Sequence, residues 1–220
     1  TPSTLELLQY APGSPGVWVG VTQYSTSGTT AGPFLPLAPP VTTRGTAIDL
    51  ANPVPLSPAT TYHMGEPVFV RLTDLDQNLA PLVQETVLIT IGVTALGERE
   101  VLRLTETGPN TGVFTGYIQT GPAPAVVGNG VLNVQAGASL SASYTDIADG
   151  TDTRNQGALI DPYGIIFNST TGQPIDGVSI TIVDGTGAPA VVYGDDGTTP
   201  FPATVVTGST LVVGGTTYAF

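Results

Sequence analysis

The sequence contains no cysteine and no lysine, and it has a single histidine and a single tryptophan. Without cysteine there can be no disulfide, no thiolate metal site and no cysteine nucleophile. A Ser–His–carboxylate triad or a zinc site could be built only around His63. No nucleophile motif stands near His63, so we expect the protein not to be an enzyme. Because lysine is missing, all five basic residues are arginines, namely Arg44, Arg71, Arg99, Arg103 and Arg154.

Charge is scarce and mostly negative. Only 10% of the residues are charged, yet the formal net charge is −12. Such a surface repels phosphate backbones and anionic lipid head groups. We therefore expect no nucleic-acid partner and no membrane insertion, and cation binding is the natural counterpart. The sequence shows no signal peptide and no apolar run of membrane-spanning length, so we expect a mature product or fragment whose targeting signal lies elsewhere.

Glycine and proline are abundant and indicate the fold class. The 220 residues include 28 glycines and 20 prolines without a regular period, and 40% of the residues are hydrophobic. This composition excludes collagen and a disordered chain, and it is typical of many short strands joined by turns. Long amphipathic helical windows are absent. We predict an all-β protein of tandem β-sandwiches with an extended Pro/Gly-rich N-terminal segment.

Residues 1–59 are predicted to form strands followed by an extended segment. The strands are expected at residues 4–10 and 17–24, with Trp18 as a core anchor. The stretch 25–58 is rich in Gly, Pro, Ser and Thr, as in polyproline-like chain. It is too apolar for a free linker, so we expect it to lie docked on a surface.

Two sandwich modules are predicted after this segment. Residues 60–160 carry short strands, among them 68–72 and 85–93, at the spacing of an immunoglobulin-like sandwich, with a tight turn at Gly108-Pro-Asn-Thr-Gly112. Residues 161–220 carry further short strands, among them 164–168 and 178–183. About 60 residues are fewer than the roughly 90 to 100 of a free-standing sandwich, so the second module is predicted to be incomplete.

Several stretches resemble modules of large bacterial extracellular and surface proteins. Residues 62–78, 102–116 and 144–152 are similar to a repeat module of such proteins. Residues 164–181 resemble the opening of the prealbumin-like B-type domains found in serine-aspartate repeat adhesins, collagen-adhesin stalks and carboxypeptidase regulatory domains. The resemblance implies structural or adhesive work at the cell surface, within a longer array. Collagen-adhesin stalks often carry a lysine–asparagine isopeptide bond, which a lysine-free chain cannot form.

Oxygen-bearing side chains gather at the predicted loop ends of the first sandwich, where loops converge. Two carboxylates about 4 Å apart repel by about 4 kcal/mol at an effective dielectric constant of 20, so such a cluster calls for a cation. Calcium takes six to eight oxygen ligands in irregular geometry, which fits better than magnesium or zinc. The alternative is that these acids only solvate loop tips and cap turns. The candidate calcium ligands are Glu66, Asp74, Asp76, Asn78, Glu106, Asp146, Asp149 and Asp152.

The sequence therefore favours a calcium-stabilised, non-enzymatic subunit or segment of a secreted bacterial fibre, surface layer or adhesin stalk. An incomplete sandwich exposes strand edges, which residues 1–58 of another copy could fill by β-strand addition. The expected partners are thus other copies or neighbouring modules of a longer chain. Two alternatives stay open: an adhesin module that binds a surface glycan or protein, and an accessory domain of a secreted hydrolase. Asp74 and Asp76 would suit glycoside hydrolysis, but one tryptophan offers little aromatic platform for a sugar.

Overall fold

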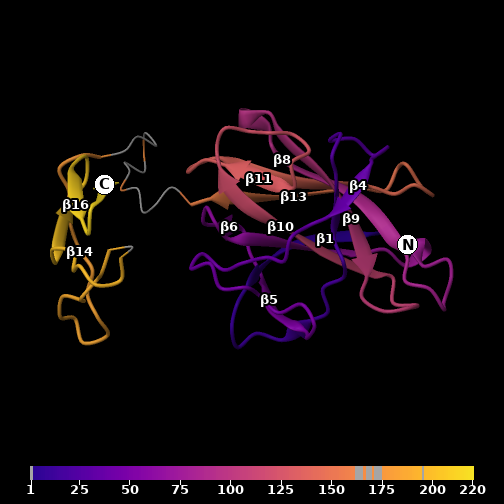
Figure 1. Cartoon of the computed structure of the whole chain (residues 1–220), viewed down its shortest axis with the longest axis horizontal. Helices are drawn as coiled ribbons and strands as arrows, with labels where there is room; N and C mark the ends of the chain where they lie inside the picture. The colour runs from indigo at the N-terminus through magenta and orange to yellow at the C-terminus, as the bar shows by residue number, and fades with distance from the viewer. Residues whose placement is uncertain (1, 162–165, 167–169, 171–174, 195) are drawn as a thin grey trace. The chain divides into compact units, whose positions relative to one another are not determined.

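The computed structural model describes residues 2–161, 166, 170, 175–194 and 196–220 and divides the chain into two compact units, Thr1–Pro162 and Tyr163–Phe220 (Figure 1). Among the described residues, the regular elements are strands and two short 3-10 turns, η1 (Leu75–Gln77) and η2 (Thr94–Leu96). The prediction of an all-β sandwich protein is therefore confirmed.

The larger unit is a β-sandwich in which one folded sheet supplies both layers. The first layer runs in the order β2 (Gly16–Val17), β5 (Val54–Pro58), β1 (Thr4–Tyr10), β7 (Pro67–Thr73), β10 (Val113–Pro122), β11 (Val131–Val134). The second layer runs in the order β3 (Gln23–Ser25), β9 (Glu98–Glu106), β8 (Thr86–Val93), β12 (Ser139–Thr145), β13 (Thr153–Ile160), β6 (Thr61–Tyr62), with β4 (Phe34–Pro36) paired to β3. The layers join where β9 and β10 pair beside their turn, at Glu106 with Phe114 and Thr105 with Thr115.

The main core lies between the two layers and follows the two-residue period of the strands. Leu7, Val68 and Val70 point into it from the first layer, and Ile89 and Leu104 from the second. The predicted strands at 4–10, 68–72 and 85–93 are thus present as β1, β7 and β8, within a residue or two at their ends.

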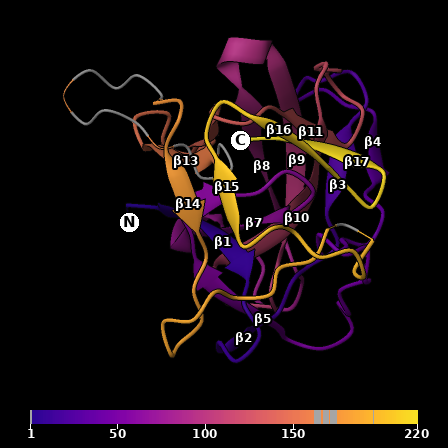
Figure 2. The same cartoon turned by 90° about the vertical axis from the view of Figure 1, so that its left-hand side faces the viewer.

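A second apolar cluster covers the outer face of the first layer. Leu8, Phe69 and Tyr117 point away from the main core, and residues from the segment 17–56 pack over them. β7 is therefore buried on both faces, which explains its nearly unbroken apolar run. Residues 1–59, which we expected to be a region of their own, belong to the larger unit, because β1 lies between β5 and β7 (Figure 2).

The predicted strand at 17–24 and the predicted burial of Trp18 are wrong. The chain forms β2 and β3 with a break between them, and Trp18 is 52% exposed. A side chain at Gly20 would approach the Thr105 side chain to 2.7 Å, so glycine lets this stretch cross closely over the β9–β10 corner. Val19, rather than Trp18, turns inward at this crossing and is buried.

The smaller unit contains two two-stranded sheets. One pairs β14 (Ser179–Thr181) with β15 (Thr204–Val206), and the other pairs β16 (Thr210–Val213) with β17 (Thr216–Ala219). Among its described hydrophobic residues, Val213 is buried. The predicted strand at 178–183 is shorter than expected, and the one at 164–168 lies outside the described residues.

Candidate metal centre

Asp74 is positioned by the end of β7 and by the turn between β9 and β10. The residue is extended, with φ −149°, and its Oδ1 accepts a hydrogen bond from the Asp76 N–H (3.3 Å), which starts η1. Its own N–H donates to the Gly112 carbonyl (2.8 Å). Gly112 has φ +60°, and a side chain there would also meet the Asp74 carbonyl at 3.1 Å. The tight turn predicted from the sequence thus holds the Asp74 backbone in place.

Asp146 follows β12 and is 2% exposed. Its Oδ1 accepts hydrogen bonds from Gln77 Nε2 (2.6 Å) and from the Ala148 N–H (2.7 Å). Its Oδ2 is buried and has no hydrogen-bond partner among the described residues. A carboxylate oxygen in this situation has lost its water without a replacement, which is costly unless a cation or a proton compensates.

The structure brings Asp74, Asp76 and Asp146 together. Each offers one carboxylate oxygen, and the three atoms lie within 4.8 Å of one another. Asp74 is 1% exposed, and its Oδ2 accepts a hydrogen bond from the Tyr144 hydroxyl (2.7 Å). All the candidate donors are oxygens, so the cluster suits a hard cation such as calcium or magnesium and offers no nitrogen or sulfur for zinc.

Asp74 and Asp76 are close enough to shift each other's pKa in opposite directions. Burial and the hydrogen bond with Asp76 raise the pKa of Asp74 to about 6. The same hydrogen bond from Asp74 lowers the pKa of Asp76, which is exposed. A cation bound by Asp74 would have to displace its proton, which would make binding dependent on pH.

Asp149 and Asp152 lie beside the cluster, but their carboxylates are engaged elsewhere. Both line a surface hollow of about 280 Å³ together with Asp76 and Asp146. Asp149 accepts hydrogen bonds from the Thr151 hydroxyl (2.6 Å) and N–H (3.0 Å), which lower its pKa. Asp152 forms an ion pair with Arg154 (2.7 Å). These two predicted ligands are therefore neighbours of the three-carboxylate cluster rather than members of it.

Glu106 caps the β9–β10 turn. It is fully buried, and its Oε1 accepts hydrogen bonds from the N–H groups of Thr111 (2.6 Å) and Gly112 (2.7 Å). Burial raises the pKa of Glu106, but these N–H groups and that of Glu85 outweigh it and hold the pKa below its ordinary value. The Asn78 side-chain nitrogen Nδ2 donates a hydrogen bond to Asn110 Oδ1 (3.0 Å). The carboxylate oxygens of Glu106 thus accept hydrogen bonds from the backbone, and Glu106 is not among the three clustered carboxylates.

Glu66 lies at the opposite end of the sandwich. Glu66 precedes β7 and Asp74 follows β7, so at about 3.3 Å per residue the extended chain separates these two residues by roughly 26 Å. Glu66 Oε2 accepts a hydrogen bond from the His63 N–H (2.7 Å) and lies 3.3 Å from His63 Nδ1. Asp161 faces the other ring nitrogen at 3.3 Å. The convergence expected for Glu66 does not occur, and the His63 ring faces carboxylates rather than a hydroxyl nucleophile.

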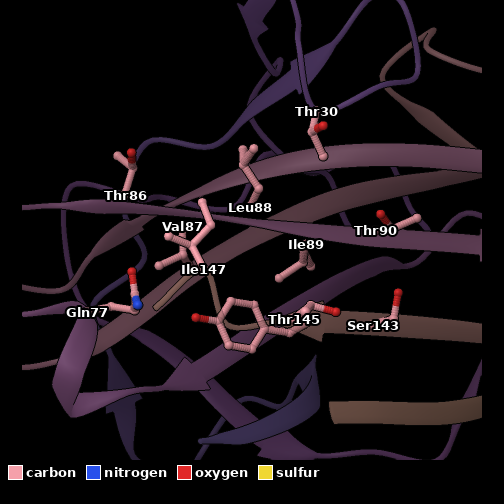
Figure 3. A pocket seen from close by; sticks show the side chains of 11 residues that line it. Thr30, Gln77, Thr86, Val87, Leu88, Ile89, Thr90, Ser143, Thr145 and Ile147 are labelled. Atoms are coloured by element: carbon pink, nitrogen blue, oxygen red, sulfur yellow. The ribbon is translucent and has the colours of Figure 1, made fainter. Parts of the chain in front are cut away.

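A neutral hollow lies beside the acidic cluster, between β8 and β12. The two strands pair only from Thr90 to Gly92 and then separate, which leaves a space of about 330 Å³. Figure 3 shows Gln77 and Ile147 near one end of this space and Thr90 and Ser143 near the other. No carboxylate is among the lining residues. The hollow is therefore chemically distinct from the cluster, although Gln77 borders both.

Sequence reasoning missed two buried acids, Glu98 and Glu100. They are 3% and 0% exposed, and they share the inward face of β9 with Leu102 and Leu104. The loop between β10 and β11 covers them: the Asn129 N–H donates to Glu100 Oε1 (2.9 Å) and the Gly130 N–H to Oε2 (3.2 Å). Glu98, Glu100, Leu102 and Leu104 follow one another at every second position, which places them on the same face of a strand. This spacing was the sequence signal for burial of the two acids. Burial raises the pKa of Glu100 to about 6.

Glu100→Gln is expected to change how stability depends on pH. The pKa of Glu100 is about 6 in the folded protein against an ordinary 4.5, so its favourable contribution is complete below pH 4.5 and is lost as the pH rises through 6. Relative to the variant, the wild type should lose about 2 kcal/mol of unfolding free energy between pH 4 and pH 7.5. Urea unfolding across this range measures the difference, with Glu6→Gln as the control. Parallel curves for wild type and Glu100→Gln would contradict the assignment.

In comparisons with known proteins, no family model and no curated protein matches this sequence. In the part of the chain that the structure describes, no helix has the length and apolar character needed to cross a membrane.

Proposed function

We propose that the chain is a non-enzymatic structural segment of a secreted bacterial fibre, surface layer or adhesin stalk, and that calcium stabilises its larger unit. The observation that supports the calcium site is the buried, unpaired Oδ2 of Asp146 within the three-carboxylate cluster. The surface location and the bacterial source follow from the resemblance of residues 62–78, 102–116 and 144–152 to surface-protein modules.

Calcium at this cluster would join the two layers of the sandwich. Asp74 and Asp76 follow β7 of the first layer, and Asp146 follows β12 of the second. The layers are also joined by side-chain packing, by the short pairing of β9 with β10, and by hydrogen bonds such as that from the Tyr144 hydroxyl to Asp74. An ion held by carboxylates of both layers resists their separation at this end, which suits a load-bearing module without disulfides or isopeptide bonds.

The proposed partners are neighbouring modules of a longer array. Strand donation by residues 1–58 of another copy, which the sequence suggested, would require β1 to leave its own sheet. β1 is paired on one side with β5 and on the other with β7, so donating it would break both ladders and expose the outer cluster. Contacts between folded modules require no such unfolding.

The calcium proposal is tested by titration and by thermal unfolding of the whole chain. Calorimetric titration of chelator-treated protein should show one site that includes Asp74, Asp76 and Asp146. At calcium 100-fold above its Kd, the unfolding free energy should rise by about 2.7 kcal/mol. Asp49→Asn, which removes one exposed loop charge elsewhere in the same unit, should bind as the wild type does. Absence of binding at millimolar calcium would overturn the proposal.

A further inference from the structure

The N-terminal strand begins beside the acidic cluster. In the ladder between β1 and β7, Thr4 pairs with Thr73, the residue that precedes Asp74. Pro2 lines the same hollow as Asp76 and Asp146. The start of β1 and the candidate ligands therefore share one end of the sandwich.

Asp152 connects the start of β1 to the loop that carries Asp146. Its Oδ2 accepts a hydrogen bond from the Ser3 N–H (2.7 Å), and its backbone carbonyl accepts one from the Asp146 N–H (3.0 Å). Arg154 closes the arrangement, because it pairs with Asp152 (2.7 Å) and donates from Nε to the Ser3 carbonyl. A chain of direct contacts thus runs from β1 to the cluster.

Ser3 contributes an oxygen that nothing in the described structure satisfies. The residue is 1% exposed, and its hydroxyl oxygen is buried without a hydrogen-bond partner. Asp146 Oδ2 is in the same condition. Buried, unpaired oxygens such as these are unusual, because buried polar atoms normally have partners. Hydroxyl and carboxylate oxygens are both donors that calcium accepts.

We infer that calcium at this centre fastens the first strand to the sandwich, with Ser3 as a further ligand and Asp152 as the residue that positions it. This inference rests on the proposed calcium site. β1 then cannot leave the sheet without releasing the ion. Since β1 lies between β5 and β7, its detachment opens the first layer, and calcium controls that step.

Hydrogen exchange measures this coupling directly. If detachment of β1 releases the ion, protection of the amides in Thr4–Leu8 should grow in proportion to calcium, by about 100-fold at 100 times Kd. Amides of β16 in the smaller unit serve as the internal control and should not respond. In Asp152→Ala, which removes the acceptor of the Ser3 N–H, the calcium dependence of β1 exchange should be lost, while titration still detects binding at the three-carboxylate cluster.

Ser3→Ala separates the ligand role from general packing. It should weaken calcium binding about 10-fold, because one ligand oxygen is lost, and it should not lower stability in chelator, because the hydroxyl that it removes has no hydrogen-bond partner there. If the wild type binds calcium but hydrogen exchange in β1 does not depend on calcium, the inference is wrong and the proposed calcium site is unaffected. Calcium protection of β1 that Asp152→Ala leaves intact would also overturn it. Absence of calcium binding would remove the proposed function itself.

Discussion

Asp146→Asn is expected to weaken calcium binding at least 100-fold and to abolish the thermal stabilisation by calcium. The substitution keeps the size of the side chain, and the amide oxygen can still accept the hydrogen bonds from Gln77 and Ala148. It places an NH₂ group where the buried, unpaired Oδ2 stands. An amide nitrogen repels a cation and cannot be a ligand, and the cluster loses one of its three negative charges.

The same variant should be more stable than the wild type when calcium is removed, by about 1 kcal/mol, because an unpaired buried charge close to Asp74 is gone. The stability difference between the variant and the wild type should thus have opposite signs in calcium and in chelator. This reversal distinguishes a ligand from a residue that merely supports the fold. Calorimetric titration and thermal unfolding in calcium and in chelator measure both effects. Asp149→Asn, in the same hollow but bonded to Thr151, is the matched control and should change the affinity only a few-fold. Equal losses in both variants would argue against this assignment of ligands.

Glu106→Ala is expected to lower the unfolding free energy by about 3 to 4 kcal/mol, because truncation leaves one buried and two partly buried N–H groups without an acceptor. Thr111 and Gly112 donate to Oε1 and Glu85 donates to Oε2. Gly112 also holds the Asp74 N–H, so the variant should bind calcium more weakly as well. Urea unfolding in chelator measures the first effect without interference from the second. Glu6→Ala, which breaks a half-exposed ion pair with Arg71, should cost less than about 1 kcal/mol.

The pH dependence of Glu106→Gln should run opposite to that of Glu100→Gln. The pKa of Glu106 is lowered in the folded protein, so its contribution is present above the ordinary value of 4.5 and disappears as the pH falls below it. The deficit of Glu106→Gln relative to the wild type should therefore shrink in acid. A deficit that stays constant down to pH 3 would show that the charge of Glu106 is unimportant.

Local patterns were sufficient to predict several strands and part of the candidate centre. Alternating apolar residues indicated β8, because a pleated strand presents every second side chain to the core, and a short apolar run indicated β7, which is buried on both faces. The spacing of Asp74 and Asp76 directly after β7 indicated neighbouring carboxylates, and the structure places them together with Asp146. These features depend on residues close in the sequence, or on strands whose ends are marked by turns.

Other features depended on long-range pairing and could not be predicted from local pattern. Glu66 and Asp74 both adjoin β7, but an extended strand separates its two ends, so only one of them reaches the cluster. Glu98 and Glu100 look like surface charges until the loop between β10 and β11 folds over them. Ser3 has no distinguishing sequence context at all. The sequence by itself determined which residues form strands and which faces are apolar. Only the tertiary structure decided which loops meet, because strand order and register are set by contacts between residues far apart in the chain.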